Sequence, residues 1–585
     1  MRVLLIHPED DLLAGSWGSQ QWDRVIDLGT AGEESYSRAA KSFGRPIGRL
    51  SEYREDFNEM RRVRELIGLG LNHLNDEFGL DWWELTSILV HQQFELAFLM
   101  GELAKTFGPN DEIHLTRPCF EADVLRTIPG LHVRTLSSSK KQQQRGVKHY
   151  LRVAKKFPAQ QLLEIFWDKT DSGYQIRGTL SRRPKPQPDG VVLLPSCYVN
   201  VSRTEAAYAE SLPDARFLLV TTRRSGWMDQ PPANVTQTWL RRYASVRVGS
   251  RRKECNDLIK RWEDMLSGLK AVPEFRMLSE LGIFDEFPER FARGLEIRDA
   301  WRNVLDWEPV RAVLCADDSN PYTHIPLWLA KNRGIPAIAS HHGALDGRYM
   351  FKRSHADTVL AKGKMEADYL LRVCGVPERI VRVGAPIVRR NISHQTAPLE
   401  KSSIVFFSEA YEISGGRARS FYEDTLPALA DLALAEGKKL VVKLHPSESV
   451  PERRKLVRQV LTAAQQSVAV VVSGPLRGEI FDDAWCGVTV MSTVATECAI
   501  RGIPCFLCAW LECWPYGYIA QFDRFEAGIR LDRREEIAGI PYRCRVSSRA
   551  RENCWTEIEP ARLRSLLGFG AVANKPEPDV ITKSA

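Results

Sequence analysis

Short apolar runs alternate with longer amphipathic stretches along most of the chain. Runs of three to six residues predict strands at 3–6, 191–194, 246–248, 310–315 and 404–407. The stretches between these runs repeat apolar residues at helical spacing. Strands that alternate with helices are typical of parallel sheets covered by helices. The pattern therefore predicts an α/β fold with doubly wound sheets.

Two interruptions divide this pattern into three units. Residues 181–189, SRRPKPQPD, combine proline with charge and lack periodicity, and a second polar stretch follows 385–386. Both are typical of linkers. We expect an N-terminal α/β accessory domain over 1–178 and two Rossmann-like domains over 190–390 and 400–560. A chain of 585 residues is also too long for one hydrophobic core.

Composition limits the classes of partner. The chain is 44% hydrophobic and 26% charged, with a formal net charge of +7, which is ordinary for a globular protein of this length. No signature of a nucleic-acid-binding domain is present, so we expect no nucleic acid partner. The basic segment 140–156 has two interpretations: a solvated helix face, or a peripheral contact with anionic membrane lipid.

The cysteines and the N-terminus indicate where the protein acts. The 12 cysteines lack the spacing of a disulfide framework and are expected to be reduced. Met1 leads directly into a strand, and no apolar run approaches the roughly 20 residues that cross a bilayer. We therefore expect a cytoplasmic protein with at most peripheral membrane contact. Cys505, Cys508 and Cys513 lie among large apolar residues and predict core thiols rather than a metal site.

The stretch 441–449, VVKLHPSES, has the strongest chemical signal. Its apolar start predicts a buried strand, and Pro446 prevents the strand from continuing. Lys443 and His445 therefore fall near the carboxyl end, where parallel sheets bind ligands. A lysine, an imidazole and hydroxyl groups at this place suit a phosphate-bearing ligand.

A second stretch, 488–497, follows the same logic. An apolar strand runs into Ser492 and Thr493, which can cap the next helix, and Glu497 lies in the first turn of that helix. The free amides of the helix start would face the same ligand. The motifs GxGxxG and GxxxxGK[ST] are absent, which argues against dinucleotide oxidoreductases and P-loop NTPases.

The second unit carries polar clusters after two of its strands. Asp317 and Asp318 follow one strand and His342 follows the next. Each is a candidate general base, and for the aspartates the alternative is capping of the following helix. In the third unit, a glycine-containing loop offers amides and a guanidinium to a diphosphate or an acceptor, with a plain surface loop as the alternative; it contains Gly415, Gly416 and Arg417.

The order and spacing of KLHP (443–446), STVATE (492–497) and GIP (502–504) resemble bacterial GT-B glycosyltransferases of capsule and surface-polysaccharide synthesis. That group includes polysialyltransferases, capsular Kdo transferases and CDP-glycerol glycerophosphotransferases, which share a His-Pro motif and a Ser-Ser/Thr motif. The resemblance covers roughly 191–531. It implies a GT-B-like pair of Rossmann-like domains, with the N-terminal α/β domain as an addition.

The resemblance implies an inverting, metal-independent transferase that needs no cofactor and takes a nucleotide-sugar donor, a CMP-sugar being favoured. The acceptor would be a surface or capsular glycan, free or lipid-linked. His445 would contact the donor phosphate and help the nucleotide leave. Ser492 and Thr493 would bind the same phosphate, and Glu497 would lie near the donor ribose or sugar. The predicted donor-binding residues are Lys443, Pro446, Ser492, Thr493, Glu497, Gly415, Gly416 and Arg417, and the predicted catalytic residues are His445, Asp317, Asp318 and His342.

Two points stay open. The acidic base motif of that group ends in glycine, whereas Asp317 and Asp318 are followed by Ser319, so the general base is not assigned. A sugar-nucleotide epimerase of the same two-domain build is an alternative function, and a non-catalytic scaffold of a polysaccharide assembly complex is another. An epimerase would need no acceptor, and a scaffold would bind nucleotide without turnover.

Overall fold

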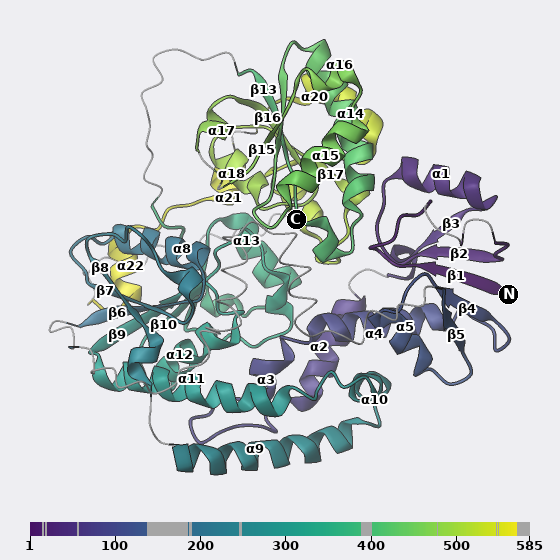
Figure 1. Cartoon of the computed structure of the whole chain (residues 1–585). Coiled ribbons are helices and arrows are strands. Elements are labelled where there is room, and N and C mark those ends of the chain that lie inside the picture. The colour runs from purple at the N-terminus through teal and green to yellow at the C-terminus, as the bar shows by residue number, and fades with distance from the viewer. Residues whose placement is uncertain are drawn as a thin grey trace.

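A computed structural model contains three parallel sheets with helices around them, one after another along the chain (Figure 1). The structure describes residues 1–569 except 14–16, 18–19, 55–57, 137–184, 186–189, 245–247, 388–400, 475, 477, 546 and 548. The basic segment 140–156 and most of both predicted linkers lie outside the described residues. Within the described ranges, every helix is too short or too polar to span a bilayer.

The N-terminal sheet has the strand order β3-β2-β1-β4-β5. The central strand β1 is the run RVLLI, whose last four residues are all buried. Its strands are β1 (Arg2–Ile6), β2 (Arg24–Asp27), β3 (Ile47–Arg49), β4 (Glu112–Leu115) and β5 (His132–Thr135). The helices of this part are α1 (Glu33–Phe43), α2 (Asn58–Gly70), α3 (Trp82–Ser87), α4 (His91–Ala104) and α5 (Phe120–Arg126).

The middle sheet has the order β12-β11-β10-β9-β6-β7-β8. Its strands are β6 (Val191–Ser196), β7 (Phe217–Thr221), β8 (Val235–Trp239), β9 (Val310–Cys315), β10 (Ala337–Ser340), β11 (Thr358–Ala361) and β12 (Val381–Val383). The helices around it are α8 (Val199–Glu210), α9 (Val248–Leu269), α10 (Pro273–Glu280), α11 (Phe287–Trp307), α12 (Pro321–Asn332) and α13 (Lys364–Asp368).

The third sheet has the order β15-β14-β13-β16-β17-β18. Its strands are β13 (Ser403–Phe407), β14 (Lys439–Lys443), β15 (Ala469–Val472), β16 (Ala484–Thr489), β17 (Cys505–Cys508) and β18 (Ile529–Leu531). The helices that accompany it are α14 (Ala418–Ala435), α15 (Val450–Val460), α16 (Ala463–Gln466), α17 (Gly478–Asp482), α18 (Val494–Ile500), α19 (Tyr518–Arg524), α20 (Ile540–Arg543), α21 (Ala550–Cys554) and α22 (Pro560–Leu566).

All three sheets follow one topological rule. The first and fourth strands of each sheet are neighbours, and the chain winds outward from them in opposite directions. This is the order of a Rossmann-like sheet, whose ligand crevice lies beyond the carboxyl ends of those two strands. The predicted fold class, a pair of Rossmann-like domains with an additional N-terminal α/β domain, is confirmed.

One predicted strand of the middle domain is wrong. The third strand is β8, whereas Val248 begins helix α9, and 245–247 lie outside the described residues. β8 is an edge strand with the sequence VTQTW, in which buried and accessible positions are mixed. An edge strand needs no continuous apolar run, so the sequence of β8 lacks the apolar pattern that marks the central strands.

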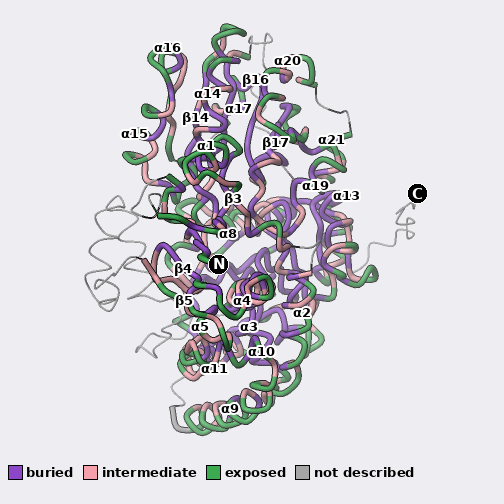
Figure 2. Tube along the Cα trace, turned by 90° about the vertical axis from the view of Figure 1, so that its right-hand side faces the viewer, coloured by how far each residue is buried: buried purple, intermediate pink, exposed green. Residues whose placement is uncertain are grey.

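Helices α2, α3 and α4 pack into the core of the middle domain. The Trp83 ring stacks on that of Trp262 in α9 with centroids 5.6 Å apart, and Phe94 meets Phe275 of α10 at 5.1 Å. Asp81 begins α3 by accepting the Trp83 amide at 3.0 Å, which helps to fix the direction of that indole. Helix α9 buries only one side in this cluster and exposes the other, as Figure 2 shows.

The C-terminal segment returns to the middle domain. The backbone of Ala385 pairs with those of Thr556 and Ile558 at 2.7 and 2.8 Å. Helix α22 then packs Leu563 and Leu567 against the middle sheet, beside β6, β7 and β8 (Figure 1). The chain therefore crosses between the middle and third domains twice.

Tyr516, in the loop after β17, joins three parts of the molecule. Its hydroxyl donates to Glu95 of α4 at 3.1 Å, and its carbonyl accepts from the Tyr369 hydroxyl of the middle domain at 2.9 Å. Burial raises the pKa of Glu95 to about 7, against the opposing effect of the Tyr516 hydrogen bond. The carboxyl group at this junction therefore titrates near neutrality.

We expect this junction to weaken as the pH rises. The folded chain binds the Glu95 proton more tightly than the unfolded chain, in which a glutamate has a pKa of about 4.3. The stabilising contribution is therefore complete below about pH 4.3 and is lost as the pH passes about 7. The melting temperature, measured between about pH 5 and pH 8, should fall less steeply with rising pH in Glu95→Gln than in the unchanged protein. Glu65→Gln, at an exposed position of α2, is the control; equal slopes in all three proteins would contradict the assignment.

Candidate functional site

His445 stands just beyond the carboxyl end of β14, in an exposed turn with Pro446. Its Nδ1 accepts a hydrogen bond from the Ser447 amide at 3.2 Å, so the proton of the neutral ring is on Nε2. Although part of its surface is exposed, the surrounding protein desolvates the ring and thereby lowers the pKa of His445, and the neighbouring Lys443 ammonium lowers it further. The ring therefore offers an uncharged Nε2–H donor to a ligand at neutral pH.

Glu448 holds this turn together and was not predicted as a site residue. Its buried carboxylate accepts from the His445 amide at 2.7 Å, from Ser408 Oγ at 2.8 Å and from Arg453 Nε at 2.7 Å. These bonds connect the turn to the loop after β13 and to helix α15. The signal in the sequence is the spacing His-Pro-x-Glu, since a carboxylate three residues on can bind the amide of its own turn.

Lys443 has backbone partners. Its Nζ donates to the carbonyls of Leu444 and Gly474, each at 2.7 Å, and the residue is only 4% exposed. The ammonium thereby ties the ends of β14 and β15 together, and burial lowers its pKa. Two of its three donors are used in this way, so its main contribution is positive potential beneath the His445 turn.

Ser492 and Thr493 follow β16, which lies two strands from β14 on the same sheet edge. Ser492 Oγ accepts the Val494 amide at 3.3 Å, whereas Thr493 is exposed and its hydroxyl makes no capping bond to α18. Glu497 forms an ion pair with Arg501 on the same helix. Ser492 therefore binds the first amide of α18 from the position before the N-cap residue, Thr493.

Glu409 lies in the crevice between the two central strands of this sheet. It follows β13 and accepts from Thr489 Oγ1 and from the Met491 amide, both at 2.9 Å, across to the end of β16. Burial raises its pKa. Because this carboxyl group already binds the amide after β16, a ligand phosphate would have to lie further along, toward Ser492.

The loop with Gly415, Gly416 and Arg417 docks on the N-terminal domain. The Gly415 carbonyl accepts the Thr30 amide at 3.0 Å. Arg417 is buried, and its guanidinium gives all five N–H donors to that domain: to the carbonyls of His7, Pro8 and Asp10 and to both carboxylate oxygens of Asp27. In this arrangement the guanidinium has no donor left for the diphosphate or the acceptor that it was predicted to bind.

Asp317 and His342 meet at the carboxyl edge of the middle sheet through Tyr198, which sequence reasoning missed. The Tyr198 hydroxyl donates to Asp317 Oδ2 at 2.9 Å and lies 3.2 Å from His342 Nε2. Because the hydroxyl has one proton, the His342 ring must donate to its oxygen. Burial lowers the pKa of His342 and keeps that ring neutral. The result is a chain of donors that ends on the carboxylate.

The two adjacent aspartates have different surroundings. Asp317 Oδ1 is buried and makes no hydrogen bond, and the Arg348 guanidinium lies 3.9 Å away. Asp318 is also buried, but its Oδ1 accepts from Lys352 Nζ at 2.7 Å and from the Tyr349 hydroxyl. Asp318 Oδ2 is likewise buried without a hydrogen bond, so each carboxylate keeps one open oxygen, and what distinguishes Asp317 is its link to His342 through Tyr198.

The carboxyl edges of the middle and third sheets contact each other. The Gly347 amide, in the segment after β10, donates to the Tyr518 hydroxyl at the start of α19 at 2.9 Å. Burial lowers the pKa of Lys362, which follows β11, and the negative charge of Glu497 on the third domain acts in the opposite direction. The clusters around Asp317 and His445 are therefore on edges that face each other.

His7 in the N-terminal domain forms a second His-Pro turn. Its Nδ1 accepts the Glu9 amide at 3.2 Å, and its carbonyl accepts the Asp10 amide at 2.9 Å. The corresponding distances in the His445 turn are 3.2 and 3.0 Å. The two turns therefore share these two hydrogen bonds and the Nε2–H tautomer, whereas the histidine amides have different partners, Glu448 for His445 and Thr116 for His7.

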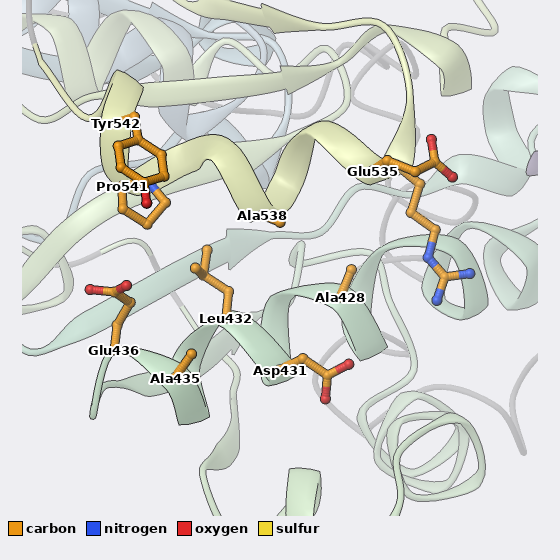
Figure 3. Close-up of a pocket in the computed structure, with 10 residues that line it drawn as sticks. Ala428, Asp431, Leu432, Ala435, Glu436, Glu535, Ala538, Pro541 and Tyr542 are labelled. Atoms are coloured by element: carbon orange, nitrogen blue, oxygen red, sulfur yellow. The ribbon is translucent and has the colours of Figure 1, made fainter.

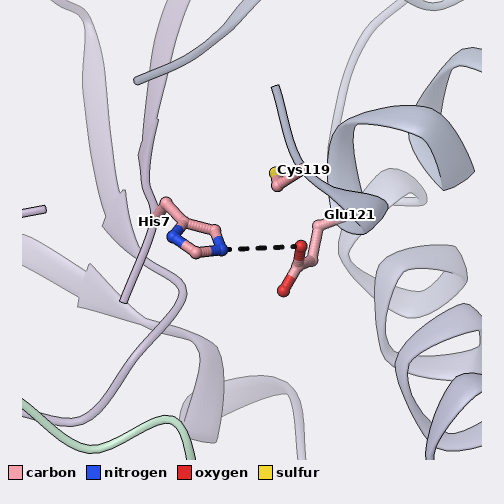
Figure 4. A group of neighbouring side chains, drawn as sticks. All are labelled: His7, Cys119 and Glu121. Atoms are coloured by element: carbon pink, nitrogen blue, oxygen red, sulfur yellow. Dashed lines mark ion pairs between the residues drawn. The ribbon is translucent and has the colours of Figure 1, made fainter. Parts of the chain in front are cut away.

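Two groups of side chains in the described residues have the types that bind metal ions. In each, potential ligand atoms lie within 4.8 Å of one another; the groups are His7, Cys119 and Glu121 (Figure 4), and Glu84, His324 and His355. Neither group contains a residue of the predicted donor or acceptor site. The metal independence of the reaction stays a prediction.

A pocket of about 430 Å³ lies elsewhere on the third domain (Figure 3). It is bordered by α14 and by the segment from Arg534 to Tyr542, with Leu432 among the apolar residues that line it. None of the predicted site residues lines this pocket.

Comparisons with known proteins find only distant likeness to solved structures. No family model matches the sequence, and no curated protein matches it. Among solved structures, the chain is similar to UDP-GlcNAc 2-epimerase from Methanocaldococcus jannaschii, with 13% identity, a TM-score of 0.42, and 65% of this chain and 99% of that one covered. It is also similar to the wall teichoic acid polymerase TagF, with 11% identity, a TM-score of 0.36, and 71% of this chain and 97% of that one covered. A third similar structure is MurG from Acinetobacter baumannii, with 12% identity, a TM-score of 0.38, and 65% of this chain and 98% of that one covered. Likeness at this level does not identify the substrate of this chain.

Arg417 is expected to stabilise the contact between the N-terminal and third domains. Arg417→Met would leave the buried Asp27 carboxylate without its cation, a change that typically costs about 3–5 kcal/mol. Differential scanning calorimetry should show an earlier unfolding transition, and limited proteolysis should cut the N-terminal domain sooner. Arg419→Met, at an exposed position two residues away, is the control. Equal behaviour of the two variants would show that the docking contact contributes little.

Proposed function

We propose that this chain is a glycosyltransferase whose third domain binds a nucleotide-activated sugar and whose middle domain binds the acceptor. Two groups at the carboxyl edges of the third and middle sheets support the proposal: the Nε2–H donor of His445, and the buried carboxylate of Asp317, one oxygen of which makes no hydrogen bond. The first suits a leaving phosphate and the second an attacking hydroxyl. The resemblance of the KLHP and STVATE motifs to capsule and surface-polysaccharide transferases agrees with this assignment.

The donor side stabilises the departing nucleotide. When the bond from the anomeric carbon to the phosphate oxygen breaks, its electron pair stays on that oxygen and negative charge develops there. The Nε2–H of His445 donates to this oxygen, while Ser492 and Thr493 bind the remaining phosphate oxygens. Because Glu448 fixes the turn in advance, little reorganisation is needed as the charge develops.

The acceptor side activates the attacking hydroxyl. Asp317 takes the hydroxyl proton as the acceptor oxygen bonds to the anomeric carbon, and Tyr198 and His342 hold the carboxylate in place. A single displacement of this kind inverts the anomeric configuration. The donor is expected to be a CMP-sugar, and the acceptor a surface or capsular glycan, free or lipid-linked, reached from the cytoplasm.

A sugar-nucleotide epimerase would also use acids and histidines between two such domains, as in the cluster of Asp317, Tyr198 and His342. Acceptor dependence separates the two functions. A thermal-shift screen with CMP, CDP, UDP, GDP and their sugars identifies the donor, and product analysis with and without a glycan follows. A product that forms without any acceptor would favour the epimerase.

His445→Ala is expected to reduce turnover by about 10²–10³-fold, the usual effect of losing one donor to a developing oxyanion. The side chain is exposed, so the melting temperature should hardly change. The measurement is the transfer rate with the identified donor and acceptor. His132→Ala, at an exposed histidine of β5, is the control. Near-normal turnover in His445→Ala would refute the donor-side assignment.

Substitution of the two adjacent aspartates should have different effects, on turnover at Asp317 and on stability at Asp318. Asp317→Asn is expected to lower turnover by about 10²–10⁴-fold, as loss of a general base does. Asp318→Asn should mainly lower thermal stability, because it removes the partner of the buried Lys352 ammonium. Steady-state rates and melting curves for both variants measure this. An Asp317→Asn enzyme with full activity would contradict the assignment of the base.

A further inference from the structure

Two tryptophans form a stacked pair at one end of the middle sheet. The rings of Trp227 and Trp239 have centroids 4.6 Å apart and an interplanar angle of 11°, and both residues are partly exposed. The Arg241 guanidinium lies 5.4 Å from the centroid of the Trp239 ring. Two accessible indoles stacked next to a cation form an apolar and positively charged surface on which a ligand can pack.

The pair lies on the same edge as the Asp317 cluster. In the sheet register, Ser196 pairs with Thr221, and Thr221 pairs with Trp239, so the three residues form one row across β6, β7 and β8. Neighbouring strands are about 4.8 Å apart, which places the Trp239 backbone about 10 Å from that of Ser196. Tyr198, which binds Asp317, comes two residues after Ser196.

The loop that carries Trp227 is fixed against the turn of Tyr198. Ser225 Oγ donates to the Cys197 carbonyl at 3.0 Å. A Cβ at Gly226 would come within 3.2 Å of the Cys197 backbone, so the two loops touch directly. The position of the indoles relative to the reacting groups is therefore set by the fold.

The surroundings of the pair are positive. Residues 222–244 contain four arginines, Arg223, Arg224, Arg241 and Arg242, and one carboxylate, Asp229, which gives a local charge of +3. Arg224, Arg241 and Arg242 are exposed. A guanidinium forms bidentate pairs with carboxylate and phosphate groups.

We propose that Trp227, Trp239 and Arg241 form a subsite for the acceptor chain, and that this chain is an anionic glycan. The indoles provide an apolar surface for the C–H face of a sugar ring, and the arginines bind its carboxylate or phosphate groups. The subsite is two strands from the Tyr198 turn, so it holds an internal part of the glycan while the growing end reaches Asp317. This inference rests on the proposed transferase function.

A single-stranded nucleic acid also combines stacking with negative charge, but the geometry favours the glycan. Nucleic acid sites stack successive bases on successive aromatic rings along a groove. Here the two rings cover each other's inner faces, so the pair presents one platform rather than a series.

Binding by the full-length protein, without any donor, tests the proposal. The probes are oligogalacturonate as a carboxylate glycan, a phosphorylated mannan oligosaccharide, neutral maltohexaose and poly(U), measured by isothermal titration calorimetry. One of the two anionic glycans should bind, more tightly than maltohexaose and poly(U). Trp239→Ala and Arg241→Ala should each weaken that binding by about tenfold or more, and Trp239→Phe should retain most of it.

Trp485→Phe is the matched control, since Lys438 Nζ lies 4.8 Å from that ring on β16, away from this edge. Unchanged glycan affinity in Trp239→Ala and Arg241→Ala would overturn the proposal, as would failure of both anionic glycans to bind, or tighter binding of poly(U). The assay is independent of turnover. The subsite and the proposed chemistry can fail separately. If Trp239→Ala loses glycan binding while His445→Ala keeps full activity, the subsite is supported and the proposed chemistry is wrong.

Discussion

One hydrogen bond, from the Ser447 amide to Nδ1 of His445, determines what the donor side of this site can do. A neutral imidazole has a single proton, and if Nδ1 carried it, Nε2 would present a lone pair to a phosphate and repel it. Glu448 keeps the turn in shape by accepting the His445 amide, while Arg453 and Ser408 hold that carboxylate. The chemistry proposed for the site depends on this tautomer.

The rest of the structure brings the carboxyl edges of the middle and third sheets together. Three sheets of the same strand order put their polar side chains at their carboxyl ends, and the middle and third sheets turn those ends toward each other. The N-terminal part contacts both: Arg417 binds it to the third domain, and Trp83 anchors it in the helices of the middle domain. A change in the spacing of the two edges would therefore have to strain or break buried contacts of the N-terminal part as well.

The sequence predicted those features that depend on local pattern. Apolar runs located most strands, and Pro446 correctly marked the end of β14. Lys443 was placed at the correct end, but its partners are backbone carbonyls, one of them 31 residues away, which no pattern reveals. The partners of Arg417 lie about 390 residues away in the chain. Tyr198 became a site residue only when the fold brought β6 beside β9.

The tautomer of His445 is the most direct test of the account. In ¹⁵N-histidine-labelled protein, the ring nitrogens can be assigned by comparison with His445→Ala and followed as the nucleotide of the identified donor is added. The ring should be neutral with its proton on Nε2, and the Nε2 signal should shift on binding while Nδ1 keeps the character of an acceptor. A ring protonated on Nδ1, or an Nε2 signal that the bound nucleotide leaves unchanged, would contradict it.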